Sequence, residues 1–296
     1  MNFRYFIHSP RRFLYGILIA TSRLWPDELY LKAYYYVTHG KKLNLKNPKT
    51  FNDKLNWMKL HYHDELFKKL ADKYEVKAYV SKVIGEKYLV PNYGVWNCFD
   101  DIDFSELPEK FVLKGTHDSG GAFICKDKNS FEFERVKKQL TKNLARNYYF
   151  PRREWVYKDP NPRIIADKLL DEGTGQELKD YKFWCFNGEP RVMYITNKGK
   201  NIEENFYDMD FNVLDINHGF PRTTPEYIRP QNFELMKYLA TKLSQNIPFV
   251  RIDFFNIKGQ VFFGEFTFYD WAGLQPFTDD DWDLKLGSWI HLSNVN

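Results

Sequence analysis

Residues 26–84 place hydrophobic and charged positions at the spacing of amphipathic helices. Between residues 64 and 80, apolar residues recur at roughly helical intervals among charges: Leu66, Leu70, Val76 and Val80. Asn47-Pro48 interrupts this pattern, and either Thr50 or Asn52 can cap the helix that follows. The pattern therefore predicts a helical N-terminal region over residues 1–84.

After Gly85 the pattern changes to short apolar runs that are typical of strands. The expected strands cover residues 88–95, 111–115, 122–125, 163–170, 181–186, 191–196, 249–255 and 261–268. Asn187-Gly188 joins one pair of runs as a hairpin, and Gly259 marks the turn of another. Helices are expected over about 130–146 and 231–245. This mixture predicts an α+β fold with antiparallel sheets, because a doubly wound parallel sheet needs a regular β-α-β order.

The predicted hairpin at 250–268 carries the most informative chemistry. If a three-residue loop is centred on Gly259, Asp253 faces Glu265 and Arg251 faces Thr267, all on one side of the hairpin. Two opposed carboxylates repel each other unless a cation lies between them, and hard oxygen ligands suit Mg²⁺. The alternative is a half-solvated hairpin in which Arg251 neutralises both acids. The aromatic residues around the carboxylates indicate burial, which favours the cation.

Two further segments have the composition of a nucleotide site. Lys114 ends an apolar strand and precedes a loop with Gly120 and Gly121, whose backbone N–H groups could approach phosphate oxygens. The strand 163–170 runs into Asp167-Lys168, where the backbone could bind a purine edge. The alternative for the first segment is a tight turn that follows a surface lysine. The alternative for the second is a set of polar residues on an edge strand. Neither segment is specific by itself.

Composition narrows the class of protein. The chain has 296 residues, 43% hydrophobic and 28% charged, which excludes a disordered chain. A net charge of +4 without a dense basic run argues against a nucleic-acid partner. Three separated cysteines without a C-x-x-C motif favour a cytoplasmic location over a disulfide framework. The absence of G-x-G-x-x-G and G-x-x-x-x-G-K-[ST] argues against standard Rossmann and P-loop sites.

The apolar run Phe13–Ala20 is too short to cross a bilayer, since a spanning helix needs ~20 apolar residues. One interpretation is a helix packed on the domain or on a partner. The other is an interfacial helix at the inner face of the plasma membrane. In that case Phe13, Leu14, Ile17 and Leu18 enter the lipid, while the basic residues of segment 1–25 meet anionic headgroups: Arg4, Arg11, Arg12 and Arg23.

In their order along the chain, these elements resemble the ATP-grasp superfamily, and in particular its TupA-like branch of the teichuronopeptide-biosynthesis type. The resemblance covers roughly residues 26–290. It rests on Asn47-Pro-Lys-Thr-Phe-Asn-Asp-Lys-Leu55, Asp72-Lys-Tyr74, Lys114-Gly-Thr-His-Asp-Ser-Gly-Gly121, Cys185-Phe-Asn-Gly188 and Gly264-Glu-Phe-Thr-Phe268. It implies an ATP-grasp fold over 85–296, in which two α+β subdomains (about 85–168 and 169–296) clasp ATP.

The resemblance also implies a role for particular residues. Those implied for ATP binding are Lys114, Ser119, Gly120, Gly121, Asp167, Lys168, Leu170 and Glu172 (or Asp171, for the ribose). Those implied for Mg²⁺ are Asp253, Glu265 and Thr267, where many relatives have Asn in place of the threonine. Lys182 would meet the γ-phosphate end, and Arg251 would steady an acyl phosphate and the tetrahedral intermediate.

The function implied is an ATP-dependent carboxylate–amine ligase of surface-polysaccharide biosynthesis. It would join an amino acid or peptide to a uronic acid or another glycan-linked carboxylate, releasing ADP and phosphate. One alternative is a Mg²⁺-dependent glycosyltransferase, for which Asp101-Ile-Asp103 and Asp208-Met-Asp210 match the loose D-x-D pattern. Another is a non-catalytic carbohydrate- or membrane-binding module.

Overall fold

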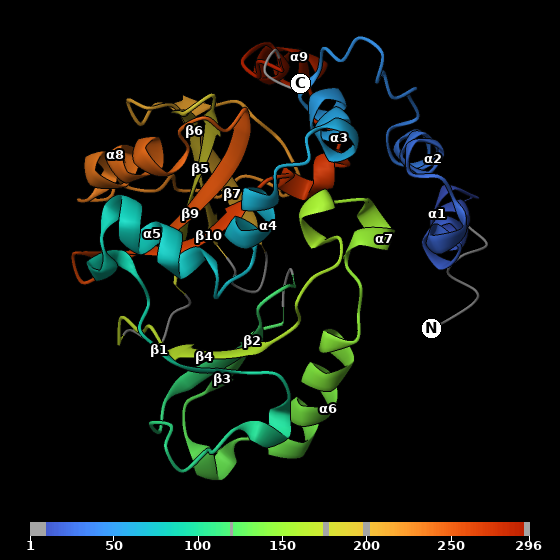
Figure 1. Ribbon diagram of the computed structural model, residues 1–296. Helices are drawn as coiled ribbons and strands as arrows, with labels where there is room; N and C mark the ends of the chain where they lie inside the picture. The colour runs from blue at the N-terminus through green and yellow to red at the C-terminus, as the bar shows by residue number, and fades with distance from the viewer. Residues whose placement is uncertain (1–9, 119–120, 174–177, 198–201, 293–296) are drawn as a thin grey trace.

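The computed structural model describes residues 10–118, 121–173, 178–197 and 202–292. Its strands form two antiparallel sheets, which Figure 1 shows one above the other. The four-stranded sheet is built from the middle of the chain, and the six-stranded sheet from the C-terminal part. The fold is the α+β arrangement that the sequence predicts.

The smaller sheet has the strand order β1-β4-β2-β3. Its strands are β1 (Asn92–Trp96), β2 (Phe111–Gly115), β3 (Phe123–Cys125) and β4 (Ile164–Lys168). Apolar residues of β2 and β4 form one core with α6 (Phe133–Leu144). Because side chains alternate along a strand, Lys114 and Asp167 lie on the face opposite α6. The strand predicted at 88–95 begins only at Asn92, because residues 86–88 form a 3-10 turn.

The larger sheet has the order β10-β9-β5-β6-β7-β8. Its strands are β5 (Asp180–Phe186), β6 (Glu189–Asn197), β7 (Glu203–Tyr207), β8 (Val213–Leu214), β9 (Phe249–Ile257) and β10 (Gln260–Thr267). Both predicted hairpins are present, whereas β7 and β8 were not predicted. Phe233 of α8 (Phe233–Leu243) packs near Phe183, while Phe51 stacks on Trp184. Since neighbouring positions of β5 point to opposite faces, helices cover both faces of this sheet.

Over residues 10–84 the predicted helical region contains α1 (Pro10–Ala20), α2 (Asp27–His39), α3 (Phe51–His61), α4 (Glu65–Ala71) and α5 (Val76–Ile84), and its first nine residues lie outside the described part. The Thr50 side chain caps α3 by accepting a hydrogen bond from the backbone of Asp53. Helices α3 to α5 share one core with the larger sheet, whereas α1 and α2 form a separate cluster. The division of the chain at residue 84 stays a prediction.

Two further helices complete the described part of the chain. Helix α7 (Tyr149–Arg152) lies between α6 and β4, and α9 (Asp280–Ser288) packs on α3. Asp279 caps α9 by accepting a hydrogen bond from the backbone of Asp281. Across the described ranges, no helix combines the length and the apolar character that crossing a membrane requires.

Candidate active site

The β9–β10 hairpin brings the predicted polar residues together by a different route from the one expected. Its loop contains two residues, Lys258 and Gly259, instead of three, so Gln260 pairs with Ile257. A β-bulge between Phe263 and Phe266 then shifts the register by one residue. The pairing of Thr267 with Arg251 is therefore the predicted one.

Gly264 makes the bulge possible. A Cβ atom at this position would lie only 3.0 Å from the backbone oxygen of Asp253. The close approach lets Glu265 and Asp253 share the guanidinium of Arg251. Local sequence at the bulge thus determines the geometry of the polar cluster.

Arg251 is the centre of that cluster. Its Nε and Nη2 atoms donate to the two carboxylate oxygens of Asp253 at 2.7 and 2.8 Å. Nη2 also donates to Glu265 at 2.9 Å, and Nη1 donates to Asp270 at 2.6 Å and to the hydroxyl of Tyr194 at 3.3 Å. The guanidinium therefore joins three carboxylates, and its neutralisation of Asp253 and Glu265 is what the alternative interpretation of the hairpin expected.

Lys182 of the neighbouring strand β5 completes the cluster. Its Nζ lies 2.7 Å from Asp253 Oδ2 and 3.3 Å from Asp180 Oδ2. Burial alone would favour the neutral amine, but the charges of Asp253 and Asp180 outweigh it and raise the pKa of Lys182. Burial likewise opposes the ionisation of Asp253, yet Arg251 and Lys182 hold the pKa of its carboxyl below the usual value. Both side chains are thus charged at neutral pH.

The charge of the cluster fits a divalent cation. Two cationic side chains, Arg251 and Lys182, face four carboxylates: Asp180, Asp253, Glu265 and Asp270. The formal charge is therefore −2. Asp180, Asp253 and Asp270 are buried, where an unbalanced charge is costly, whereas the side chain of Glu265 is 45% exposed. Within the described residues, no group of three or more His, Cys, Asp and Glu side chains could hold a metal ion. A Mg²⁺ ion bound by Asp253 and Glu265 would accordingly take further ligands from phosphates and water.

A second charged cluster occupies the smaller sheet. Lys114 Nζ lies 2.9 Å from Asp167 Oδ2, and Lys77 Nζ of α5 lies 3.1 Å from Asp167 Oδ1. Asp167 is buried, whereas both lysines keep some exposure. Because α5 belongs to the core of the larger sheet, this cluster links the smaller sheet to that core. Burial lowers the pKa of Lys77 against the opposing effect of Asp167.

Lys73 holds the beginning of the loop that follows β2 through contacts with Asp118. Lys73 donates to the backbone oxygen of Asp118, and its Nζ lies 3.3 Å from Asp118 Oδ1. A Cβ atom at Gly115 would lie 3.0 Å from the same carboxylate. Gly121 adopts a positive φ of 94°, which glycine accommodates without strain. Ser119 and Gly120 lie outside the described residues.

The remaining predicted ATP-binding residues follow Asp167. Lys168 ends β4 with an exposed side chain, and its backbone N–H donates to Pro91. Leu170 is half-buried, and Glu172 and Asp171 are exposed. Thr267 lies beside the Arg251 cluster, where its hydroxyl is 3.4 Å from Glu265. These placements leave the side chains of Lys168 and Glu172 accessible to a ligand.

Sequence analysis missed three partners of the predicted site: Asp270, Tyr194 and Lys77. Asp270 follows β10 in a short 3-10 segment, and Tyr194 lies on β6. Tyr194 pairs with Lys182 across β5 and β6, so the strand alternation could have placed it on the polar face. Asp270 and Lys77 approach through tertiary contacts that no periodicity indicates.

The two D-x-D segments have local roles. Asp208 accepts hydrogen bonds from the backbone of Asp210 and Asn212, at 2.9 and 2.8 Å. Asp103 accepts one from the backbone of Ser105 at 2.9 Å. Carboxylates that bond to N–H groups two positions ahead are typical of turns. The hydrogen bonds of Asp103 and Asp208 are thus those of turn residues and do not indicate a metal site.

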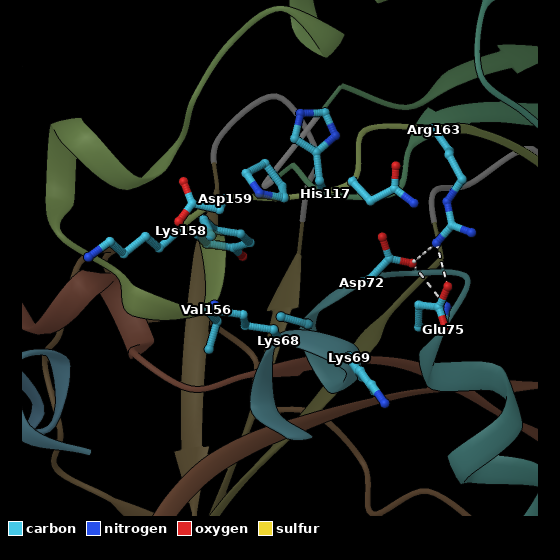
Figure 2. A pocket seen from close by; sticks show the side chains of 13 residues that line it. Lys68, Lys69, Asp72, Glu75, His117, Val156, Lys158, Asp159 and Arg163 are labelled. Carbon is cyan, nitrogen blue, oxygen red and sulfur yellow. Dashed lines mark hydrogen bonds and ion pairs between the residues drawn. The ribbon is translucent and has the colours of Figure 1, made fainter. Parts of the chain in front are cut away.

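A cavity of about 290 Å³ opens beside the loop after β2. Its lining includes Lys68, Asp72, His117, Lys158 and Arg163, which Figure 2 shows around it. Arg163 is held there by Glu75 at 2.7 Å and by Asp72 at 3.4 Å.

Tyr157 also lines this cavity. Burial, followed by the charges of Glu154 and Glu265, raises the pKa of Tyr157 well above its usual value. The cavity contains side chains of both charges.

Comparison with solved structures gives many matches of low identity. They include the D-alanine–D-alanine ligases of Bacillus anthracis complexed with ATP (12% identity, TM-score 0.39) and of Helicobacter pylori (16%, 0.40). The aligned regions cover 67% and 75% of this chain but 53% and 61% of those ligases. The chain thus spans a little over half the length of the structures it matches. At these values the likeness assigns no activity.

Comparison with curated proteins gives no match. Comparison with protein families does: the family described as TupA-like ATPgrasp matches residues 53–291. The matched region includes the described members of both charged clusters and the whole of both sheets. The ligases of the ATP-grasp superfamily use ATP and typically Mg²⁺, in keeping with the −2 charge of the Arg251 cluster. Because the match extends over most of its length, the chain belongs to the TupA-like ATP-grasp family.

Proposed function

We propose that this protein is an ATP-dependent carboxylate–amine ligase that acts in surface-polysaccharide biosynthesis. The observation that carries the proposal is the pair of charged clusters, one on each sheet, in a chain of the ATP-grasp family. The Arg251 cluster has the charge to accept Mg²⁺, and the Lys114 cluster has the cations to accept phosphates. ATP would lie between them, and a reaction that consumes ATP would take place in the cytoplasm.

The nucleotide would be held mainly by the smaller sheet. Lys114 and Lys77 would exchange Asp167 for phosphate oxygens, while the backbone of the segment 167–170 would hold the adenine. The loop at 119–121 would close over the phosphates, and Glu172 or Asp171 would reach the ribose. Asp253 and Glu265, with Thr267 beside them, would hold a Mg²⁺ ion, whose charge neutralises the phosphate oxygens.

The larger sheet would supply the groups that stabilise the transition state. Lys182, held charged by Asp253, would meet the γ-phosphate as it moves to the acceptor carboxylate. Arg251, held by Asp270, would then stabilise the acyl phosphate and the tetrahedral intermediate formed when the amine attacks. In such a reaction the barrier falls through positioning and charge neutralisation, and no covalent enzyme nucleophile is needed.

The cavity beside Tyr157 is proposed as the acceptor site. It has enough room for a small ligand and opens beside the loop after β2 that follows Lys114. Its mixture of cationic and anionic side chains suits a sugar acid or an amino acid. Lys69, Lys158 and Asp159 are exposed at its lining and therefore accessible to such a ligand. The choice of a uronic acid and an amino-acid amine follows the resemblance of the sequence motifs to the teichuronopeptide-biosynthesis type.

An ADP-release assay tests the proposal. Purified protein is incubated with ATP, Mg²⁺, glucuronate and a mixture of amino acids, and each component is omitted in turn. We expect ADP to form only with both glucuronate and the amino acids present, and Arg251→Gln to lower turnover by roughly 10²-fold or more. Arg191→Gln, on the exposed part of β6, is the control. ADP release that needs neither acceptor nor amine, or an Arg251→Gln variant as active as the control, would contradict the proposal.

A further inference from the structure

The N-terminal segment carries the whole net charge of the chain. Residues 1–25 contain four arginines (Arg4, Arg11, Arg12 and Arg23) and no acidic residue. The chain has 43 basic and 39 acidic residues, so residues 26–296 contain 39 of each and have no net charge. The segment is therefore purely cationic, whereas residues 26–296 contain equal numbers of basic and acidic residues.

The same segment presents an apolar face to solvent. On α1 the side chains of Phe13, Leu14 and Ile17 are 52%, 48% and 43% exposed. At the helical spacing they fall within about 100° of the circumference, so they form one continuous stripe. Leu24, just after the helix, is 81% exposed. Leu18 does not belong to this stripe, which corrects the sequence-based expectation, because it is buried against α2.

Hydrogen bonds and an ion pair hold the segment that carries the stripe against the rest of the protein. Arg153, which is buried, donates to the backbone oxygens of Ser22 and Trp25, and its Nε lies 2.6 Å from Asp27 Oδ1. The hydroxyl of Tyr34 on α2 lies 3.2 Å from that of Tyr15. In Figure 1, α1 and α2 lie at the edge of the molecule, away from both sheets. The exposed face is thus held at the periphery in a defined orientation.

We propose that this face docks the protein on an anionic lipid bilayer. Helix α1 would lie in the plane of the headgroups, with Phe13, Leu14 and Ile17 in the acyl boundary and Arg11 and Arg23, both exposed, against lipid phosphates. The concentration of positive charge favours this partner over a second copy of the chain, because two such segments would repel each other. The docked enzyme would face acceptors carried on the membrane.

Co-sedimentation with vesicles tests the docking surface. The full chain is mixed with vesicles of equal parts phosphatidylcholine and phosphatidylglycerol, and in parallel with vesicles of phosphatidylcholine alone. The test variant is Leu14→Ser/Ile17→Ser. The matched control, Ile228→Ser/Leu284→Ser, removes the same residue types from exposed positions elsewhere. A charge variant, Arg11→Gln/Arg23→Gln, leaves the apolar stripe intact, and analytical ultracentrifugation reports the oligomeric state of each protein.

We expect wild type and control to bind the mixed vesicles, with release at high salt. The apolar variant should bind at least roughly tenfold more weakly. The charge variant should lose about fivefold for each arginine removed. Equal binding by the apolar variant and the control, or absence of wild-type binding to the mixed vesicles, would overturn the proposal. So would a wild-type dimer that the apolar variant abolishes without any binding to vesicles, because the stripe would then be an interface between two copies.

Discussion

At the residue scale, Arg251 determines which carboxylates belong to the candidate site. Asp253 and Glu265 could be predicted from the alternation along two strands, because both positions follow from one turn. Asp270 could not be predicted, since it lies beyond the strand and is brought in by a segment in which Trp271 and Ala272 adopt positive φ. It is fully buried, and its contact with Arg251 is shorter than that of Glu265. Asp270 is thus a positioning residue for the guanidinium.

Asp270→Asn tests this role. The amide keeps the shape of the side chain but removes its charge, so Arg251 loses its anchor on the side away from the bulge. We expect turnover to fall at least roughly tenfold and stability by about 1–3 kcal/mol, the range for a buried hydrogen bond to a charged group. Binding of ADP with Mg²⁺ should persist. Asp280→Asn, at an exposed ion pair, is the control, and equal turnover of the two variants would argue against a positioning role.

The buried side chain of Glu204 makes the free energy of unfolding depend on pH. The side chain is buried and accepts one hydrogen bond, from Thr196 at 3.2 Å. Burial, followed by the charge of Asp270, raises the pKa of Glu204 to about 8, against ~4.3 in an unfolded chain. Between these values the folded protein keeps a proton that the unfolded chain releases, so the free energy of unfolding falls as pH rises, by up to about 1.4 kcal/mol per pH unit.

Urea unfolding at a series of pH values measures this effect. We expect Glu204→Gln to remove most of the decline between pH ~5 and ~8, because the amide cannot release a proton. Glu203→Gln, at the adjacent position of β7, should keep the wild-type slope. Parallel slopes for wild type and Glu204→Gln would show that Glu204 is not buried in its neutral form.

At the scale of elements, the β9–β10 hairpin shows how far periodicity can predict a site. The register around Arg251 and Thr267 agrees with the prediction although the loop is one residue shorter, because the bulge adds that residue back. A loop of three residues and a loop of two followed by a bulge place the far ends of the strands identically. Sequence alternation therefore predicts which side chains meet, but it cannot predict where the extra residue lies.

Gly264→Ala tests the bulge. The new methyl group would lie 3.0 Å from the Asp253 oxygen, so the strands must separate. We expect a loss of about 1–3 kcal/mol in stability and weaker Mg²⁺-dependent binding of ADP. In Gly259→Asn, at φ 79° with open space around the Cβ position, stability and binding should change little, since asparagine tolerates the left-handed region. Equal effects of the two substitutions on ADP binding would mean that the bulge does not shape the site.

At the scale of the whole molecule, each charged cluster is assembled from distant parts of the chain. Strand β1 pairs with β4 and β9 pairs with β5, although neither pair is consecutive in sequence. Periodicity predicts that these strands exist and which face is polar, and the motif order indicates the family. Periodicity does not indicate which strands become neighbours. For the same reason it does not predict that Lys77, carried by a helix of the other core, lies beside Asp167.

The central claim is that adenine nucleotide and Mg²⁺ bind between these clusters, and thermal unfolding with added ligand tests it most directly. ADP or ATP with Mg²⁺ is compared with UDP-glucuronate, in wild type and in Asp253→Asn/Glu265→Gln. At ~100 times its dissociation constant, a ligand that binds only the folded protein stabilises it by about 2.7 kcal/mol. We expect adenine nucleotides alone to stabilise the wild type, and the double variant to lose the Mg²⁺-dependent part. Stabilisation by UDP-glucuronate and not by ATP would contradict the account and favour a glycosyltransferase.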